Sequence, residues 1–170
     1  MHLGIAAIYR TPDGALPDDD NKNTFVYKSA GVSTIDNRNL IYAEVDNARH
    51  QVKLGTELLI YYGKFSFQSE YIRTQVKRRN ALADYTGQGG YAQCSWLLIG
   101  NTYDYDAAPA CPSRPIGRAL ELCGRFNIVD MNNRTAEVLG GAQKDFSLGL
   151  NYYINKHIAV SYTHLRAHET

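Results

Sequence analysis

The sequence predicts an all-β, antiparallel chain, and three observations lead to this prediction. Apolar and polar residues alternate with a period of two in several runs, which is typical of strands with two different faces. The 170 residues include 13 Tyr and 14 Gly but only 5 Pro and 2 Met, a composition that favours strands and turns over helices. No apolar run approaches the ~20 residues that a membrane helix needs, so this chain would cross a bilayer only as a barrel.

The segment 51–71 predicts a β-hairpin. Its first run places on one side Val52, Leu54, Thr56, Leu58, Ile60 and Tyr62, and on the other Gln51, Lys53, Gly55, Glu57 and Tyr61. Leu59 alone breaks the alternation. Gly63-Lys64 then makes a two-residue break, and glycine accepts the positive φ of such a turn. The second run places Phe65, Phe67, Ser69 and Tyr71 opposite Ser66, Gln68 and Glu70.

Three later runs repeat the pattern. Their apolar sides hold Ala92, Cys94, Trp96 and Leu98, then Leu120, Leu122, Gly124, Phe126 and Ile128, then Phe146, Leu148, Leu150 and Tyr152. Each run has about ten residues, the length of a tilted strand that crosses a bilayer. The connections at 63–64 and 154–157 are predicted to be tight, whereas 79–90, 101–115 and 130–142 are predicted to be longer and polar. Outer-membrane barrels have short turns on one rim and long loops on the other. Two of the three longer connections are enough to supply the long-loop rim here. The third must therefore lie on the short-turn rim.

The apolar faces suit lipid, with Tyr61, Tyr62, Phe65, Tyr152 and Tyr153 near the tight turns as interfacial aromatic residues. The opposite faces suit water. The candidate lumen-facing residues are Lys53, Glu57, Gln68, Glu70, Glu121, Arg125 and Asn127. The alternation also fits a soluble β-sandwich or barrel, for example a carbohydrate-binding module, that buries its apolar face against a second sheet. The pattern alone leaves these two interpretations open.

Four stretches favour the membrane interpretation by resemblance to a known family. They are "GTELLIYYGKFSFQSEYIRTQVKR", "GGYAQCSWLLIGN", "RALELCGRFNIVDMN" and "DFSLGLNYYINKHIAV". In order and spacing from about residue 34 to 160 they resemble consecutive strands of the phosphate-selective porin O and P family, and "HLGIAAIYR" resembles an earlier strand. Lys64 stands where that family usually has Pro, and Cys94 and Cys123 stand where small or apolar residues are more common.

The resemblance implies a bacterial outer-membrane porin, a homotrimer of 16-stranded up-and-down barrels, of which this chain would form about seven or eight strands. It implies passive diffusion of anions such as phosphate, or of other small polar solutes, past basic lumen residues. Lys53 and Arg125 supply positive charge on the predicted lumen face, but Glu57, Glu70 and Glu121 lie there too. The family's constriction residues belong to segments that this chain mostly lacks, so none is transferred.

The remaining motifs predict little chemistry. Lys77, Arg78 and Arg79 are a candidate basic rim that gathers anions, or else an ordinary solvated strand end. The three cysteines, Cys94, Cys111 and Cys123, lack the C-x-x-C spacing of a metal site. No catalytic arrangement is evident, so the sequence predicts neither an enzyme nor a cofactor. The net charge of +1 gives no reason to expect a nucleic-acid partner.

The last ten residues are expected to be foreign to the protein. "SYTHLRAHET", residues 161–170, resembles the translation of a transposon-end adapter used in sequencing libraries. The expected division is therefore a partial porin barrel over residues 1–160, interrupted within a strand, and a non-native tail over 161–170. Met1 need not be the natural start.

Overall fold

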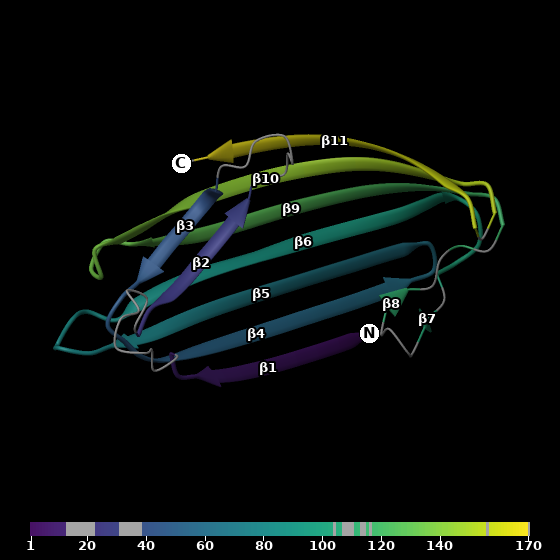
Figure 1. Cartoon of the computed structure of the whole chain (residues 1–170). Coiled ribbons are helices and arrows are strands. Elements are labelled where there is room, and N and C mark those ends of the chain that lie inside the picture. The colour runs from purple at the N-terminus through teal and green to yellow at the C-terminus, as the bar shows by residue number, and fades with distance from the viewer. Residues whose placement is uncertain are drawn as a thin grey trace.

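The computed structural model describes residues 1–12, 23–30, 39–103, 105–106, 111–112, 115, 117–155 and 157–169. Seven strands form one antiparallel sheet in the order β1-β4-β5-β6-β9-β10-β11. Their bounds are β1 His2–Arg10, β4 Ala48–Tyr62, β5 Phe65–Arg78, β6 Tyr85–Ile99, β9 Ala119–Asn133, β10 Val138–Tyr153 and β11 Ala159–Glu169. Two small hairpins interrupt this meander, β2 (Phe25–Ala30) with β3 (Asn39–Val45) and β7 (Tyr105–Asp106) with β8 (Cys111–Pro112). Figure 1 shows the long strands side by side, which confirms the predicted antiparallel meander.

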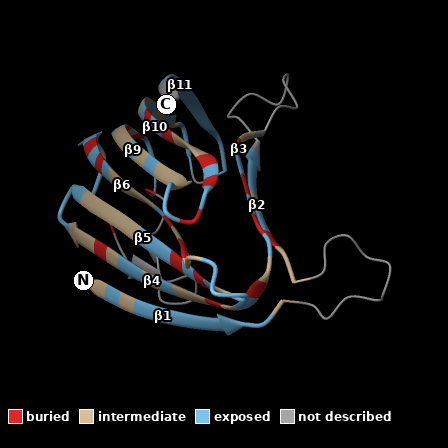
Figure 2. Cartoon of the chain, turned by 90° about the vertical axis from the view of Figure 1, so that its left-hand side faces the viewer, coloured by how far each residue is buried: buried red, intermediate tan, exposed pale blue. Residues whose placement is uncertain are grey.

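The sheet is a single curved layer. Seen from one end, its strands follow an arc from β1 to β11, and β2 and β3 lie on the open side of that arc (Figure 2). We call the face toward β2 and β3 the inner face and the opposite face the outer face. In the described part of the chain, no second sheet covers the outer face. The sandwich interpretation required such a cover, so the structure favours the barrel wall.

The outer face carries large apolar side chains that are exposed. Neighbouring strands place them side by side, since Trp96 pairs with Leu122 and Leu122 pairs with Leu150. Trp96 is 57% exposed and Phe146 51%. We call this surface the apolar band; its exposed members include Leu54, Tyr62, Phe65, Tyr71, Trp96, Leu122, Phe126, Ile128, Phe146, Leu148, Leu150 and Tyr152. The predicted single sheet with Leu, Phe and Tyr on the outside is thus confirmed.

The height of the apolar band approaches the roughly 25 Å of the lipid-facing band in outer-membrane barrels. On β9 it runs from Leu120 to Ile128, which at about 3.4 Å per residue is roughly 27 Å along the strand and roughly 20 Å across a bilayer at the usual tilt. At one end it reaches the tight turns. At the other end a polar row follows it, because Arg73 pairs with Gln88 and Gln88 pairs with Asp130. The strands therefore extend beyond the band only at the end where the β2–β3 hairpin lies.

The β2–β3 hairpin is attached to the inner face by an apolar core. Buried side chains of the hairpin and the sheet meet there: Phe25, Ala43, Val45, Ala48, Val76, Tyr85, Ala136 and Val138. The ring of Tyr27 stacks on that of Tyr85, with centroids 5.9 Å apart. Gly140 permits the contact with β3, because a Cβ at this position would lie 2.4 Å from the Cβ of Ala43. The hairpin is an insertion, since β1 pairs directly with β4.

Several predicted boundaries and faces need correction. Strands β4, β5, β6, β9 and β10 have 14 to 16 residues rather than about ten, because they continue past the apolar band. The connections predicted at 79–90 and 130–142 shrink to 79–84 and 134–137, since polar residues there belong to strands. Of the three longer connections, one was expected on the tight-turn side, and the structure identifies it as the connection around 101–115. Tyr62, Phe65 and Tyr152 are on the outer face, but Tyr61 and Tyr153 pack on the inner face near Leu97. In the described residues no helix is long and apolar enough to cross a membrane.

Candidate functional site

All seven candidate lumen residues project from the inner face, as the strand register shows. Lys53 lies opposite Thr74, and Glu57 opposite Glu70. Gln68 pairs with Gln93, which in turn pairs with Arg125. Asn127 lies opposite Tyr91 and Asp145, and Glu121 lies opposite Asn151. The register thus brings the seven residues onto one surface, while their role in lining a pore remains a prediction.

Arg125 lies at the centre of a polar cluster on β6, β9 and β10. Its guanidinium carbon is 3.8 Å from the ring centroid of Tyr91, which is close cation–π stacking. Its Nε donates to Oδ1 of Asn127 at 2.8 Å, and Nη1 donates to Oε1 of Gln93 at 3.2 Å. Asn127 in turn donates to Asp145 at 2.5 Å. These contacts fix the position of the guanidinium on the inner face.

Glu121 has a different environment from the other predicted residues. It is only 7% exposed, and its carboxylate accepts hydrogen bonds from the hydroxyl of Tyr103, from Tyr153 at 2.8 Å and from Asn151 at 2.9 Å. Tyr103 precedes β7, and burial raises the pKa of its hydroxyl, so it stays a donor. Leu97, Ala119 and Tyr103 form a small buried core beside it. Glu121 therefore fastens the connection after β6 to the inner face.

The remaining acidic candidates have identifiable neighbours. Oε1 of Glu57 lies 3.1 Å from Nε2 of His2 on β1, and the two side chains are 52% and 36% exposed. Glu70 accepts a hydrogen bond of 2.6 Å from the hydroxyl of Tyr91. Because Glu57 and Glu70 are directly opposite each other, two carboxylates share this part of the inner face. The surface is therefore of mixed charge rather than uniformly basic.

The candidate basic rim does not form one surface. Lys77 is exposed and forms an ion pair with Asp84. Arg78 forms an ion pair with Asp46, and its guanidinium also donates to the carbonyl of Ala136 at 3.0 Å. Its side chain is only 9% exposed, because it lies between the turn that contains Asp46 and the turn that contains Ala136. Arg79 is exposed just after β5. Arg78 thus has a structural contact, whereas Lys77 and Arg79 are accessible to solutes.

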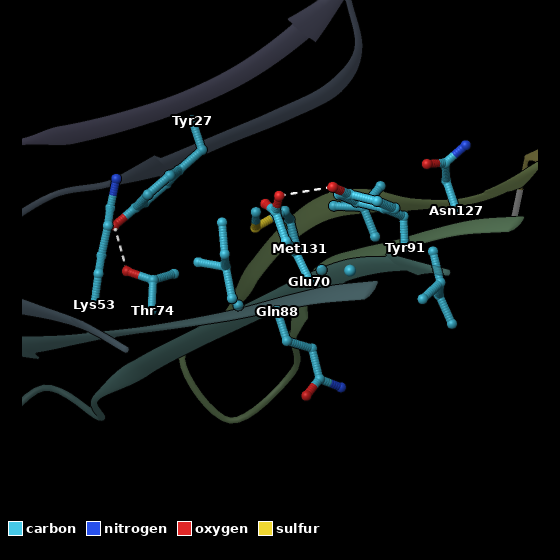
Figure 3. A pocket seen from close by; sticks show the side chains of 14 residues that line it. Tyr27, Lys53, Glu70, Thr74, Gln88, Tyr91, Asn127 and Met131 are labelled. Atoms are coloured by element: carbon cyan, nitrogen blue, oxygen red, sulfur yellow. Dashed lines mark hydrogen bonds between the residues drawn. The ribbon is translucent and has the colours of Figure 1, made fainter. Parts of the chain in front are cut away.

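A cavity of about 350 Å³ lies between the β2–β3 hairpin and the sheet. Three of the seven candidates contribute to its lining, namely Lys53, Glu70 and Asn127. Figure 3 shows Tyr27 of the hairpin near Lys53 and Thr74, with Tyr91 and Glu70 further along. Tyr27 is held by Thr74, whose Oγ1 is 3.1 Å from its hydroxyl, and by Gln51. Burial raises the pKa of Tyr27, so its hydroxyl stays protonated at neutral pH.

The cysteines are not gathered into a site in the described residues. Cys94 is exposed on the outer face, and Cys123 is half-buried on the inner face. The side chain of Cys111 lies outside the described residues. Among the side chains that the structure describes, no three His, Cys, Asp or Glu residues are grouped in a way that could hold a metal ion.

Sequence reasoning missed three tyrosines that shape the inner face. Tyr91 lies on the polar side of its run and could have been found by parity, since the register places it beside Asn127 and Glu70. Tyr27 and Tyr103 could not have been found in this way. Both belong to segments that fold back over the sheet, and period-two alternation carries no signal for such a contact.

A single antiparallel sheet with an exposed apolar band outside and a polar inner face defines the class: this is the wall of a transmembrane β-barrel. The chain belongs to the family "Phosphate-selective porin O and P", whose model matches residues 1–170. It is also similar to Porin O of Pseudomonas aeruginosa (strain PAO1), with 26% identity over 191 residues. The match covers 98% of this chain and 43% of Porin O, so the chain spans less than half the length of that relative.

Proposed function

We propose that the full-length protein is a channel of the bacterial outer membrane through which anions such as phosphate, or other small polar solutes, diffuse passively. The observation that carries the proposal is the contrast between the two faces of one sheet. The outer face exposes the apolar band, which suits lipid, whereas the inner face carries Lys53, Arg125 and their polar neighbours, which suit water and solutes. Family membership supports a channel rather than an enzyme. The proposed assembly is a homotrimer, as the family resemblance implies.

Two segments on the inner face would narrow such a channel. The β2–β3 hairpin covers the end where the strands extend beyond the apolar band. The connection after β6 covers the other end through Tyr103 and Glu121. Solutes would pass between them, beside Lys53, Glu70, Arg125 and Asn127. Arg125 suits an anion because its guanidinium presents several donors in a planar fork.

We also propose that residues 161–170 are not native, in line with their resemblance to adapter sequence. The backbone of residues 161–169 pairs with β10, but two side chains in this stretch suit the outer face poorly. His164 lies opposite Leu148, and Arg166 opposite Phe146, within the apolar band. A cation on the lipid-facing side of a barrel strand is costly, and the cost rises toward the middle of the bilayer.

The proposed function is tested with the full-length protein, purified from outer membranes and added to planar lipid bilayers. We expect stepwise conductance increases and a reversal potential in a KCl gradient that shows a preference for chloride. Cross-linking in detergent should give a trimer. A protein that partitions into membranes but gives no conductance steps would refute the proposal.

A further inference from the structure

The cavity between the hairpin and the sheet has charge of opposite sign at its two ends. Among the fourteen residues that line it, only Lys53 and Glu70 are charged. Lys53 lies opposite Thr74, and Glu70 is four residues further along the strand of Thr74, about 13 Å away at the usual rise. Figure 3 shows the two side chains apart, with Tyr27 and Met131 among the side chains between and around them. The cavity therefore has a positive end and a negative end.

The walls between the two charges are largely apolar. They include Tyr27, Ile72, Val129 and Met131. Gly87 contributes backbone only, and a Cβ there would lie 2.5 Å from the Sδ of Met131, which would have to move. These walls favour an apolar body over a fully hydrated ion.

The charged groups are held in place but remain available. Nζ of Lys53 lies 5.7 Å from the ring centroid of Tyr27, so the ammonium is beside this ring at one end of the cavity. Glu70 accepts one hydrogen bond from Tyr91, and a carboxylate has acceptor capacity for more. A ligand with a cation and an anion at its two ends could engage both groups.

We propose that this cavity binds short zwitterionic peptides of two or three residues with an apolar or aromatic side chain. Their C-terminal carboxylate lies near Lys53 and their N-terminal ammonium near Glu70. An extended dipeptide spans about 7 Å and a tripeptide about 10 Å, and the Lys and Glu side chains reach over the rest of the 13 Å. This inference rests on the proposed function and names a solute class for it.

An inorganic anion fits the cavity less well than a peptide. Near Lys53 it would gain one ion pair, but it would leave Glu70 at the other end of the cavity without a partner, and the walls between them are largely apolar. A peptide uses both charges, and its side chain contacts the apolar wall. Opposite charges at fixed separation also orient the peptide within the cavity.

The test measures equilibrium binding to the full-length protein in detergent by isothermal titration calorimetry. The probes are alanyl-phenylalanine, its N-acetylated form and its C-terminal amide. We expect Lys53→Gln and Glu70→Gln each to weaken binding of the free dipeptide about tenfold. Lys53→Gln should not weaken binding of the C-terminal amide, because that peptide lacks the carboxylate that would face Lys53. Glu70→Gln should not weaken binding of the N-acetylated peptide, because that peptide lacks the ammonium that would face Glu70.

Two matched variants serve as controls. Lys144→Gln changes an exposed lysine on the outer face, and Glu137→Gln changes an exposed glutamate in the turn between β9 and β10. Both should bind the free dipeptide like the wild type. Equal losses in these controls, or losses that do not depend on the peptide termini, would overturn the proposed orientation.

Binding and conduction separate this inference from the proposed function. A full-length protein that conducts ions but binds none of the three peptides would overturn the peptide site and leave the channel intact. Peptide binding with the expected dependence on both termini, without conductance, would support the site and refute the channel. Phosphate that binds with the same dependence on Lys53 and Glu70 as the dipeptide would also overturn the inference.

Discussion

Reversing the charge of Arg125 should reduce the preference of the channel for anions. The side chain is held against Tyr91 and by Asn127 and Gln93, so its charge has a defined position on the inner face. A unit charge acts on an ion 4 Å away with about 1 kcal/mol in bulk water and about 4 kcal/mol in a medium of dielectric constant 20. Arg125→Glu changes the sign, so an anion at this distance loses at least about 2 kcal/mol.

That energy corresponds to roughly a 30-fold change in local anion concentration. Other charges of the lumen share the control of selectivity, so we expect the anion-to-cation permeability ratio to fall about three- to tenfold. Reversal potentials in single-channel recordings of the full-length protein measure this ratio. The effect should be largest near 0.1 M salt, where the screening length is about 10 Å, and should fade near 1 M, where it is about 3 Å.

Arg118 provides the matched control. It is exposed just before β9 and does not belong to the inner face of the sheet. Arg118→Glu should leave the permeability ratio nearly unchanged, whereas Lys53→Glu should lower it like Arg125→Glu. Heat-dependent mobility on gels shows whether each variant is folded. Equal shifts for Arg118→Glu and Arg125→Glu in folded protein would refute the assignment of the two faces.

Three other changes test separate parts of the structure. Gly140→Ala should displace the hairpin, because its Cβ would clash with Ala43, and single-channel conductance should rise; an unchanged conductance would argue against narrowing by the hairpin. Tyr103→Phe removes a hydrogen-bond donor to buried Glu121, so we expect the unfolding free energy to fall by about 1–3 kcal/mol and the open-channel current to become noisier. A quiet current together with wild-type stability would contradict the role of this contact. Arg166→Leu should stabilise the chain in lipid vesicles by about 1 kcal/mol, because Arg166 lies opposite Phe146 toward one edge of the apolar band. Denaturant titration measures this change, and a loss of stability would count against a lipid-facing position.

The sequence was informative wherever a residue's position follows from alternation. Lys53, Glu70, Arg125 and Asn127 were assigned to one side of their strands, and the register places them on the inner face. Leu59, which broke the alternation, is indeed on the inner face, where it is 5% exposed. An apolar residue on the polar side of an alternating run therefore indicates that the inner face is covered at that position.

Other features depend on contacts that alternation does not encode. The alternating runs suggested strands of about ten residues, because polar residues beyond the apolar band were indistinguishable from loop residues. The docking of Tyr27 onto Thr74 and Gln51 joins segments far apart in the sequence, and no local pattern predicts it. For Arg78 the sequence showed charge but not its partner, Asp46, which lies in a distant turn.

The direct pairing of β1 with β4 has a consequence for how such a protein can change over time. His2 lies opposite Leu59 and Arg10 opposite Gln51, so the wall is continuous without the segment between these strands. The β2–β3 hairpin inside that segment supplies Tyr27 to the cavity and contacts the long sheet through side chains, but it is not one of the strands of that sheet. Insertions, deletions and substitutions in it can alter what passes through the lumen while strand register and membrane insertion are preserved. Evolution, or an engineer exchanging this segment between relatives, can thus vary solute preference independently of the barrel.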